Sequence, residues 1–175
     1  MNSFNYGDFV QQITFASYPE ISVPTSDVKI ISEKCKSIKY LTFSRVFSVD
    51  TIAMFLENCP KLVSFALFGH KSPLFGNALR PIRDGKCSKL QHLELQNWKS
   101  EWKHDILKDI GKRCPLLTSL IISNLVTNTL ASAIVNSFPN LKSFKCSTIT
   151  GAGFTILITG CPKLKFLSLE FPYIR

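Results

Sequence analysis

Residues 59–67 read CPKLVSFAL, and residues 161–169 read CPKLKFLSL. The same phrase recurs along the chain with small changes. Its further copies are CKSIKYLTF at 35–43, CSKLQHLEL at 87–95, CPLLTSLII at 114–122, FPNLKSFKC at 138–146 and, in a weaker form, GDFVQQITF at 7–15. The copies begin at residues 7, 35, 59, 87, 114, 138 and 161, so the steps between them are 28, 24, 28, 27, 24 and 23 residues. One structural unit therefore repeats along the chain.

The phrase predicts one short β-strand in each unit. In residues 59–67, Leu62 docks the incoming turn, while Phe65 and Leu67 alternate with outward-facing residues, as in a strand with one buried face. Each strand is followed by a return segment of similar length, so successive strands are expected to pair in parallel.

Helical periodicity fills most of the intervals between the phrases. Over residues 48–57, Ser48 is a suitable N-cap, and Ile52, Phe55 and Leu56 share one face. The same spacing predicts helices over 26–34, over 103–112 (Ile106, Leu107 and Ile110 buried), over 128–136 (Leu130, Ala133 and Ile134 buried) and over 154–158 (Phe154, Leu157 and Ile158 buried). Residues 69–86 hold two prolines and three glycines, which predict a broken or very short helix.

A period of about 20–29 residues is typical of leucine-rich repeats, whose units bury their apolar faces only by stacking. We therefore predict an α/β fold: a leucine-rich-repeat solenoid of about seven repeats, with a curved parallel sheet on the concave side and helices on the convex side. With 45% hydrophobic and 19% charged residues, residues 1–175 are expected to form a single domain with a sizeable core. The last phrase ends at Leu169 without an obvious polar cap, which suggests part of a longer array.

The six cysteines are expected to pack in the core. Five of them begin a phrase, at residues 35, 59, 87, 114 and 161, and Cys146 takes a strand position where other units have Leu, Phe or Ile. In the phrase at 138–146 the leading residue is Phe138, which cannot ligate a metal. The two nearest in sequence, Cys146 and Cys161, are 15 residues apart, whereas zinc sites usually use close pairs. We expect no metal and no cofactor. No catalytic constellation or nucleotide-binding motif is present, so we expect no catalytic residues and no enzyme activity.

The formal net charge of +9 comes from scattered basic residues. Several lie within two residues of the start of a phrase, so stacking is expected to align them along one rim: Lys34, Lys36, Lys61, Lys86, Lys89, Lys112, Arg113 and Lys163. They either offset helix dipoles or bind an acidic protein segment or a polyphosphate. RNA fits poorly, because aromatic residues are not interleaved with the rim.

Membrane insertion and secretion are not expected. No window approaches the roughly 18 apolar residues of a membrane span, and the first ten residues lack a secretory signal. Six cysteines without such a signal favour a reducing compartment, so we expect a cytoplasmic or nuclear protein.

The strand residues that alternate with the buried ones are predicted to form the binding face. Its larger side chains are the main candidates for contact with a target protein: Tyr40, Phe68, His92, Glu94, Ile121, Lys145 and Phe166. Weaker candidates lie in the segments that leave the strands: Trp98 and Trp102 in residues 97–104, and Arg80 and Arg83 in residues 69–86.

The leading Cys-Pro-x-Leu of these repeats resembles the cysteine-containing repeats of the F-box/LRR proteins, over residues 7–169. The opening YGDFVQQITF is similar to the phrase that starts the array in fungal members, at Tyr6, Phe9, Val10, Ile13 and Phe15. The resemblance implies a substrate-recognition subunit of an SCF-type ubiquitin ligase. Contact with a Skp-type adaptor would require an upstream F-box, which this chain does not contain.

Two alternatives remain open. One is a free-standing repeat protein that binds or inhibits a partner without a ligase, as antagonist-of-mitotic-exit proteins with similar repeats do. The other is a basic scaffold for a polyanion.

Overall fold

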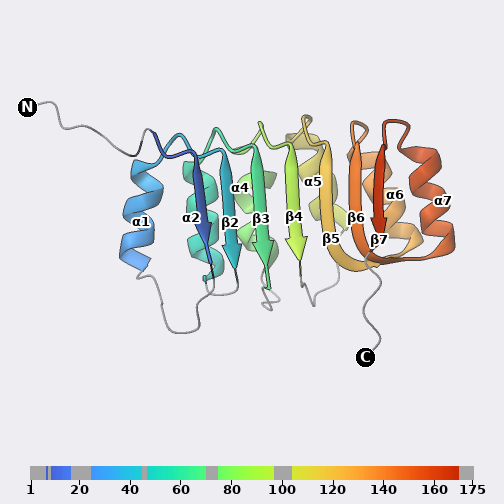
Figure 1. Ribbon diagram of the computed structural model, residues 1–175, viewed down its shortest axis with the longest axis horizontal. Helices are drawn as coiled ribbons and strands as arrows, with labels where there is room; N and C mark the ends of the chain where they lie inside the picture. Colours follow the sequence, from blue (N-terminus) through green and yellow to red (C-terminus); the bar gives the residue numbers. More distant parts are fainter. Residues whose placement is uncertain are drawn as a thin grey trace, which may run out of the picture.

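A single parallel sheet, with its strands in chain order, runs through the computed structural model, which describes residues 7, 9–16, 25–44, 47–69, 75–96 and 104–169 (Figure 1). Within these residues the sheet has seven strands, ordered β1 to β7, and every neighbouring pair is parallel. The elements are β1 (Gln12–Phe15), α1 (Thr25–Lys34), β2 (Tyr40–Ser44), α2 (Val49–Asn58), β3 (Ser64–Phe68), α3 (Phe75–Ala78), α4 (Arg80–Arg83), β4 (His92–Gln96), α5 (His104–Arg113), β5 (Ser119–Val126), α6 (Asn128–Ser137), β6 (Ser143–Ile149), α7 (Gly151–Gly160) and β7 (Phe166–Leu169). The predicted α/β class and parallel sheet are confirmed.

The described helices lie together on one side of the sheet and leave its other side uncovered (Figure 1). The row of helices extends beyond the sheet at both ends, with α1 outside β1 and α7 outside β7. Helices pack about 8–10 Å apart, whereas paired strands lie about 4.8 Å apart. The row of helices is therefore longer than the row of strands.

The strands alternate between core and surface, as the phrases predict. The second and fourth positions of β2, Leu41 and Phe43, are at most 1% exposed, and they pair in register with Phe65 and Leu67 of β3. Stacking of Phe15 on Phe43, with ring centroids 4.9 Å apart, continues this packing into β1. Each strand therefore extends the same two rows of core side chains.

The turns that lead into β2 to β7 make the same pair of backbone hydrogen bonds to the preceding unit. In the third unit, the amides of Val63 and Ser64 both donate to the carbonyl of Lys39 in the preceding unit, at 2.8 and 2.9 Å. The amide of Leu62 donates to the carbonyl of Cys59, at 3.2 Å. The same bonds to the preceding unit recur at the carbonyls of Gln11, Val63, Gln91, Thr118 and Lys142. This geometry explains why the leading residue and the leucine three positions later recur together.

The leading cysteines are buried at these turns and carry free thiols. The thiol of Cys87 donates to the carbonyl of Leu56, and that of Cys114 to the carbonyl of Cys87, each at 3.5 Å. Burial raises the pKa of Cys59 and of Cys87 to about 12, so both thiols are protonated at neutral pH. Thiols in this state are poor nucleophiles and metal ligands, which supports a packing role.

Three helices begin at hydroxyl caps. Ser48 accepts from the amide of Thr51 at 3.1 Å, as predicted, and Thr127 and Thr150 cap α6 and α7 in the same way. The prediction for the buried face of α7 was wrong. Leu157 is buried, but Phe154 is 38% and Ile158 48% exposed.

The inward face of α7 begins instead at Gly153, which packs on Thr150 and on the carbonyl of Val126. A glycine contributes nothing to a hydrophobic pattern, so the predicted apolar face of α7 was displaced by one position along the sequence. A smaller error of the same kind occurs in α6, where Ala131, at 0% exposure, takes the buried position predicted for the half-buried Ala133.

The unit between β3 and β4 differs from the others, as its prolines and glycines predict. Two four-residue helices, α3 and α4, replace the usual ten-residue helix. Pro81 lies at the start of α4, and Gly85 follows its end with a positive φ of 85°.

Candidate protein-binding surface

The uncovered side of the sheet, here called the open face, consists of the outward side chains of β1 to β7. Strand pairing arranges them in rows across the sheet, because equivalent positions of neighbouring strands are in register. The first row is Gln12, Tyr40, Ser64, His92, Ser119, Ser143 and Phe166, and the second is Thr14, Thr42, Ala66, Glu94, Ile121, Lys145 and Ser168. Phe68 lies in a third row, between Ser44 and Gln96.

All seven main candidates from the sequence lie on this face, at different depths. Phe166 is 69% and Tyr40 46% exposed, and His92 is also exposed. The side chains of Phe68, Glu94, Ile121 and Lys145 are half-buried. The two most exposed aromatic rings therefore stand on β7 and β2, toward opposite ends of the sheet.

The middle of the open face combines two opposite charges with an apolar side chain. Glu94, Ile121 and Lys145 are consecutive members of the second row, on β4, β5 and β6. At about 4.8 Å per strand, the backbone positions of Glu94 and Lys145 are separated by about 10 Å. The side-chain amide of Gln96 donates to the Glu94 carboxylate and orients it. Together these groups offer a partner an acceptor, an apolar contact and a cation.

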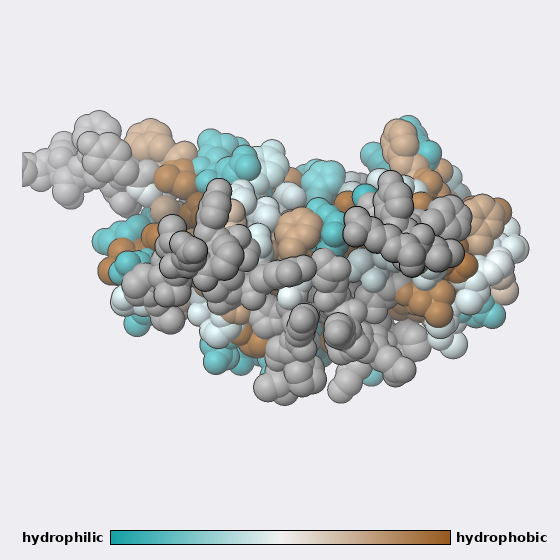
Figure 2. All heavy atoms as spheres, turned by 60° about the horizontal axis from the view of Figure 1, so that its bottom comes forward, coloured by the Kyte–Doolittle hydropathy of each residue, from teal (hydrophilic) through white to brown (hydrophobic). Residues whose placement is uncertain are grey.

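Small hydroxyl side chains surround these larger groups. Ser64, Ser119 and Ser143 are three of the seven residues of the first row, and Thr42 and Ser168 belong to the second. Figure 2 shows the same mixture on the described surface: polar and weakly polar residues are interspersed with isolated apolar ones, and the larger brown patches lie toward the two ends of the molecule. A surface that presents a few large side chains among small ones suits a folded protein partner better than a small molecule.

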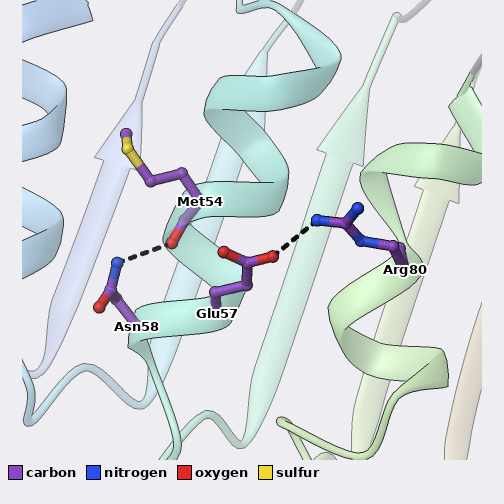
Figure 3. Close-up of polar contacts among 4 residues, drawn as sticks. All are labelled: Met54, Glu57, Asn58 and Arg80. Carbon is purple, nitrogen blue, oxygen red and sulfur yellow. Dashed lines mark hydrogen bonds and ion pairs between the residues drawn. The ribbon is translucent and has the colours of Figure 1, made fainter.

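The two arginine candidates occupy α4 rather than a loop, and both are paired within the chain. The guanidinium of Arg80 lies 2.8 Å from the carboxylate of Glu57 on α2, as Figure 3 shows. In the same view the side chain of Asn58 donates to the carbonyl of Met54, at the end of α2. Arg83 donates twice to Asp109 of α5, at 2.7 and 3.0 Å. These pairs link the irregular unit to the helices on either side.

Trp98 and Trp102, the remaining loop candidates, lie outside the described residues.

A groove of about 520 Å³ that the sequence did not predict lies between α5 and α6. Its lining includes Lys108, Gly111 and Ala133, so it belongs to the helix side and includes none of the candidates.

The turns that lead into the strands carry a row of cations, here called the basic edge. It contains the eight residues of the predicted rim together with Lys39, Lys142 and Lys165, each of which directly precedes a strand: Lys34, Lys36, Lys39, Lys61, Lys86, Lys89, Lys112, Arg113, Lys142, Lys163 and Lys165. The sequence predicted eight of these eleven residues, because each lies within two residues of the start of a phrase. Lys39, Lys142 and Lys165 were not predicted, because they lie farther from the start of the phrase and next to the first residue of a strand.

Among residues 7, 9–16, 25–44, 47–69, 75–96 and 104–169, no three His, Cys, Asp or Glu side chains are grouped closely enough to hold a metal ion. No helix within the described ranges is long and apolar enough to span a membrane.

No protein-family model matches the chain, and no curated protein sequence matches it. Among solved structures, it is similar to a chain in the crystal structure of the TLR13–ssRNA13 complex, with 15% sequence identity and a TM-score of 0.42. The likeness covers 94% of this chain and 20% of the TLR13 chain, so this chain spans about a fifth of the length of that one. What the open face binds must therefore be inferred from the residues and geometry of this chain.

Proposed function

We propose that residues 1–175 form one leucine-rich-repeat solenoid of about seven repeats, and that its open face binds a target protein. The observation that carries the proposal is the register of the sheet. One uncovered surface collects outward side chains from every strand, and its exposed larger side chains, Tyr40, His92 and Phe166, stand among small hydroxyls. Exposed aromatic side chains on a rigid surface are typical of the residues that dominate protein–protein binding energy.

Within this proposal, the target is a substrate for ubiquitin-dependent degradation. Support comes from the resemblance of the repeats to those of F-box/LRR proteins, and the leading cysteines that carry the resemblance pack at the turn of each unit. A Skp-type adaptor would be a partner only through an F-box upstream of these residues. We place the protein in the cytoplasm or nucleus, where buried free thiols such as these remain reduced.

A free-standing binder or inhibitor is the second candidate function. It has the same open face and the same target contact, but no ligase subunits accompany it. The two candidate functions therefore differ in whether ligase subunits associate with the protein, and they share the same binding surface.

The role of the open face can be tested by affinity capture with matched variants. We expect Tyr40→Ala, His92→Ala and Phe166→Ala, combined in one chain, to lose partners that the wild type retains, because the variant removes exposed contact groups without opening the core. The control is Ile30→Ala with Ile158→Ala, which removes exposed apolar side chains (56% and 48%) from the helix side. Capture of the same proteins by the wild type and the open-face variant would refute the proposal.

The ligase link needs a separate measurement on the product of the complete gene. If the protein is a substrate receptor, a Skp adaptor and a cullin co-purify with it, and they remain bound to the open-face variant while the target is lost. Retention of the target without adaptor or cullin would reject the ligase and favour the free-standing binder.

A further inference from the structure

The basic edge has more positive charge than the fold needs. It holds more than half of the 21 lysines and arginines of the chain. Among the described residues, the acidic ones at the same turns are Glu33 and Asp84. The ion pairs found among the described residues join Arg80 to Glu57 and Arg83 to Asp109, and neither includes a member of the basic edge.

Helix dipoles explain only part of this row. Lys34 lies in the last turn of α1, and Lys112 and Arg113 lie in the last turn of α5, where a cation stabilises the helix end. The last turns of α2, α6 and α7 contain no basic residue. The turns after these helices are nevertheless basic, with Lys61, Lys142, Lys163 and Lys165 beyond the helix end.

These turn lysines recur at two positions of the repeated phrase. Lys61, Lys89 and Lys163 occupy its third position, and Lys39, Lys142 and Lys165 its fifth, immediately before the strand. The turns before β2 to β7 make the same pair of backbone hydrogen bonds to the preceding unit, so side chains from equivalent positions emerge in line along the edge. The result is an ordered row of ammonium groups along one side of the sheet.

Neutral partners hold several of these ammonium groups in place. Lys36 donates to the side-chain oxygen of Asn58 at 2.6 Å, and Lys163 donates to that of Asn140, also at 2.6 Å. Lys61 donates more weakly to the hydroxyl of Ser37, at 3.4 Å. The bonds of Lys61 and Lys163 reach the preceding unit, and all three bonds leave the charge of the lysine uncompensated. Such groups are partly oriented before any anion arrives.

We propose that the basic edge binds an acidic polypeptide segment of the target protein, next to the surface that contacts the open face. This inference rests on the proposed function and identifies the partner's chemistry. From β2 to β7 the edge crosses five strand intervals, or about 24 Å at 4.8 Å each, which an extended peptide covers with about seven residues.

A peptide fits this row better than a nucleic acid does. Binding of single strands depends on aromatic side chains placed along the path of the bases. Among the described residues, the exposed Phe and Tyr rings next to the edge are Phe9, Tyr40 and Phe166. Phe9 precedes β1, and Tyr40 and Phe166 stand on β2 and β7 with four strands between them, so these rings lie toward the two ends of the row and do not follow its length. The row is also mostly lysine, whereas planar recognition of phosphate favours arginine.

The test measures binding of a fluorescent eight-residue peptide of alternating Glu and Ser to the complete 175-residue chain, by anisotropy, over a series of salt concentrations. We expect binding at low salt that weakens as salt rises, because the contacts are solvent-exposed ion pairs. The same peptide with Gln in place of Glu should not bind.

Two charge-reversal variants locate the site. Lys89→Glu with Lys142→Glu changes two exposed members of the basic edge, and Lys29→Glu with Lys108→Glu changes two exposed helix lysines by the same net charge. The edge variant should weaken peptide binding on the order of tenfold or more, and the helix variant by no more than about twofold. Equal weakening by both variants, or no binding by the wild type at low salt, would overturn the proposal.

Two further measurements separate the alternatives. Single-stranded RNA and inorganic polyphosphate of matched charge are competitors, and tighter binding of either than of the Glu peptide would also overturn it. The open-face variant with alanine at residues 40, 92 and 166 should bind the acidic peptide as the wild type does. If the wild type fails to bind the peptide while the open-face variant still loses its partners, only this inference fails. If the peptide binds but the open-face variant loses no partner, the proposed function fails instead.

Discussion

Replacement of Gly111 by alanine should destabilise the protein, although alanine is the better helix former. Gly111 lies in the interior of α5, where that helix meets the end of α6. A Cβ built there would lie 2.7 Å from the Cβ of Ser137 and even closer to the backbone carbonyl oxygen of Ser137. Carbon atoms in contact prefer a separation of about 3.5–4.0 Å. A backbone carbonyl cannot rotate away, so the two helices must separate.

The magnitude follows from two opposing terms. Overpacking of this kind costs up to about 3 kcal/mol, and exchange of glycine for alanine in a helix returns about 1 kcal/mol. The net loss in the free energy of unfolding is therefore about 2 kcal/mol, which for a chain of this length lowers Tm by about 4–8 °C.

Two other glycines in the same chain provide matched controls. A Cβ on Gly151, at the start of α7, would meet no atom within 4 Å, so Gly151→Ala should be neutral or stabilise by up to about 1 kcal/mol. A Cβ on Gly160 would lie 2.5 Å from a methyl group of Val135, a side chain that can shift more readily than backbone. Gly160→Ala should therefore fall between the other two.

Urea unfolding followed by circular dichroism at 222 nm measures all three variants against the wild type. The midpoints should rank Gly151→Ala highest, then Gly160→Ala, then Gly111→Ala. A Gly111→Ala protein as stable as Gly151→Ala would show that α5 and α6 are not packed as closely as described.

Three further substitutions test other parts of the fold. Phe43→Ala should cost about 3–5 kcal/mol in urea unfolding, because a fully buried ring leaves a cavity under β2, and a cost below 1 kcal/mol would contradict its central position. Ser48→Ala should cost about 1 kcal/mol through loss of the cap on the amide of Thr51, and Ser48→Asp should retain most of the stability. The buried thiols of Cys59 and Cys87, with pKa values raised to about 12, keep protons that the unfolded chain loses above about pH 9. The free energy of unfolding should therefore fall between pH 9 and 11 by up to about 1.4 kcal/mol per pH unit for each thiol, and a variant with alanine at both positions should show a shallower slope.

Much of the fold and the composition of the open face follow from local sequence patterns. Alternation is a property of single strands, so the outward position of Tyr40 and Thr42 follows directly from the inward position of Leu41 and Phe43. Because neighbouring strands pair in register, equivalent outward positions then lie next to one another across the sheet.

Other features depend on contacts that no local pattern contains. β5 and β6 are longer than the other strands because they continue to pair after a shift in register between Ile122 and Leu125. After this shift, Leu125 pairs with Thr148. The ion pairs of the irregular unit join α4 to partners more than twenty residues away in sequence, as between Arg80 and Glu57. Spacing within one phrase cannot identify such partners.

The sequence predicted only part of the chemistry of the open face and the basic edge, because this chemistry also depends on features that no local pattern contains. Lys142 and Lys165 belong to the basic edge because the turn presents them immediately before a strand, and their distance from the leading residue alone did not indicate this. Sequence patterns identify which side chains are exposed. They do not identify the partner, whose shape and charge are absent from the chain.

The repeated turn also has an evolutionary consequence. At six successive places, one carbonyl accepts the two amides of the following unit, at Gln11, Lys39, Val63, Gln91, Thr118 and Lys142. A gene duplication that copies one strand, its helix and the next turn would insert a unit that already has the right donors on one side and the right acceptor on the other. Each such event would lengthen the open face by about 4.8 Å and add one outward residue to every row. An ancestral array can in this way acquire a wider range of partners without a new fold.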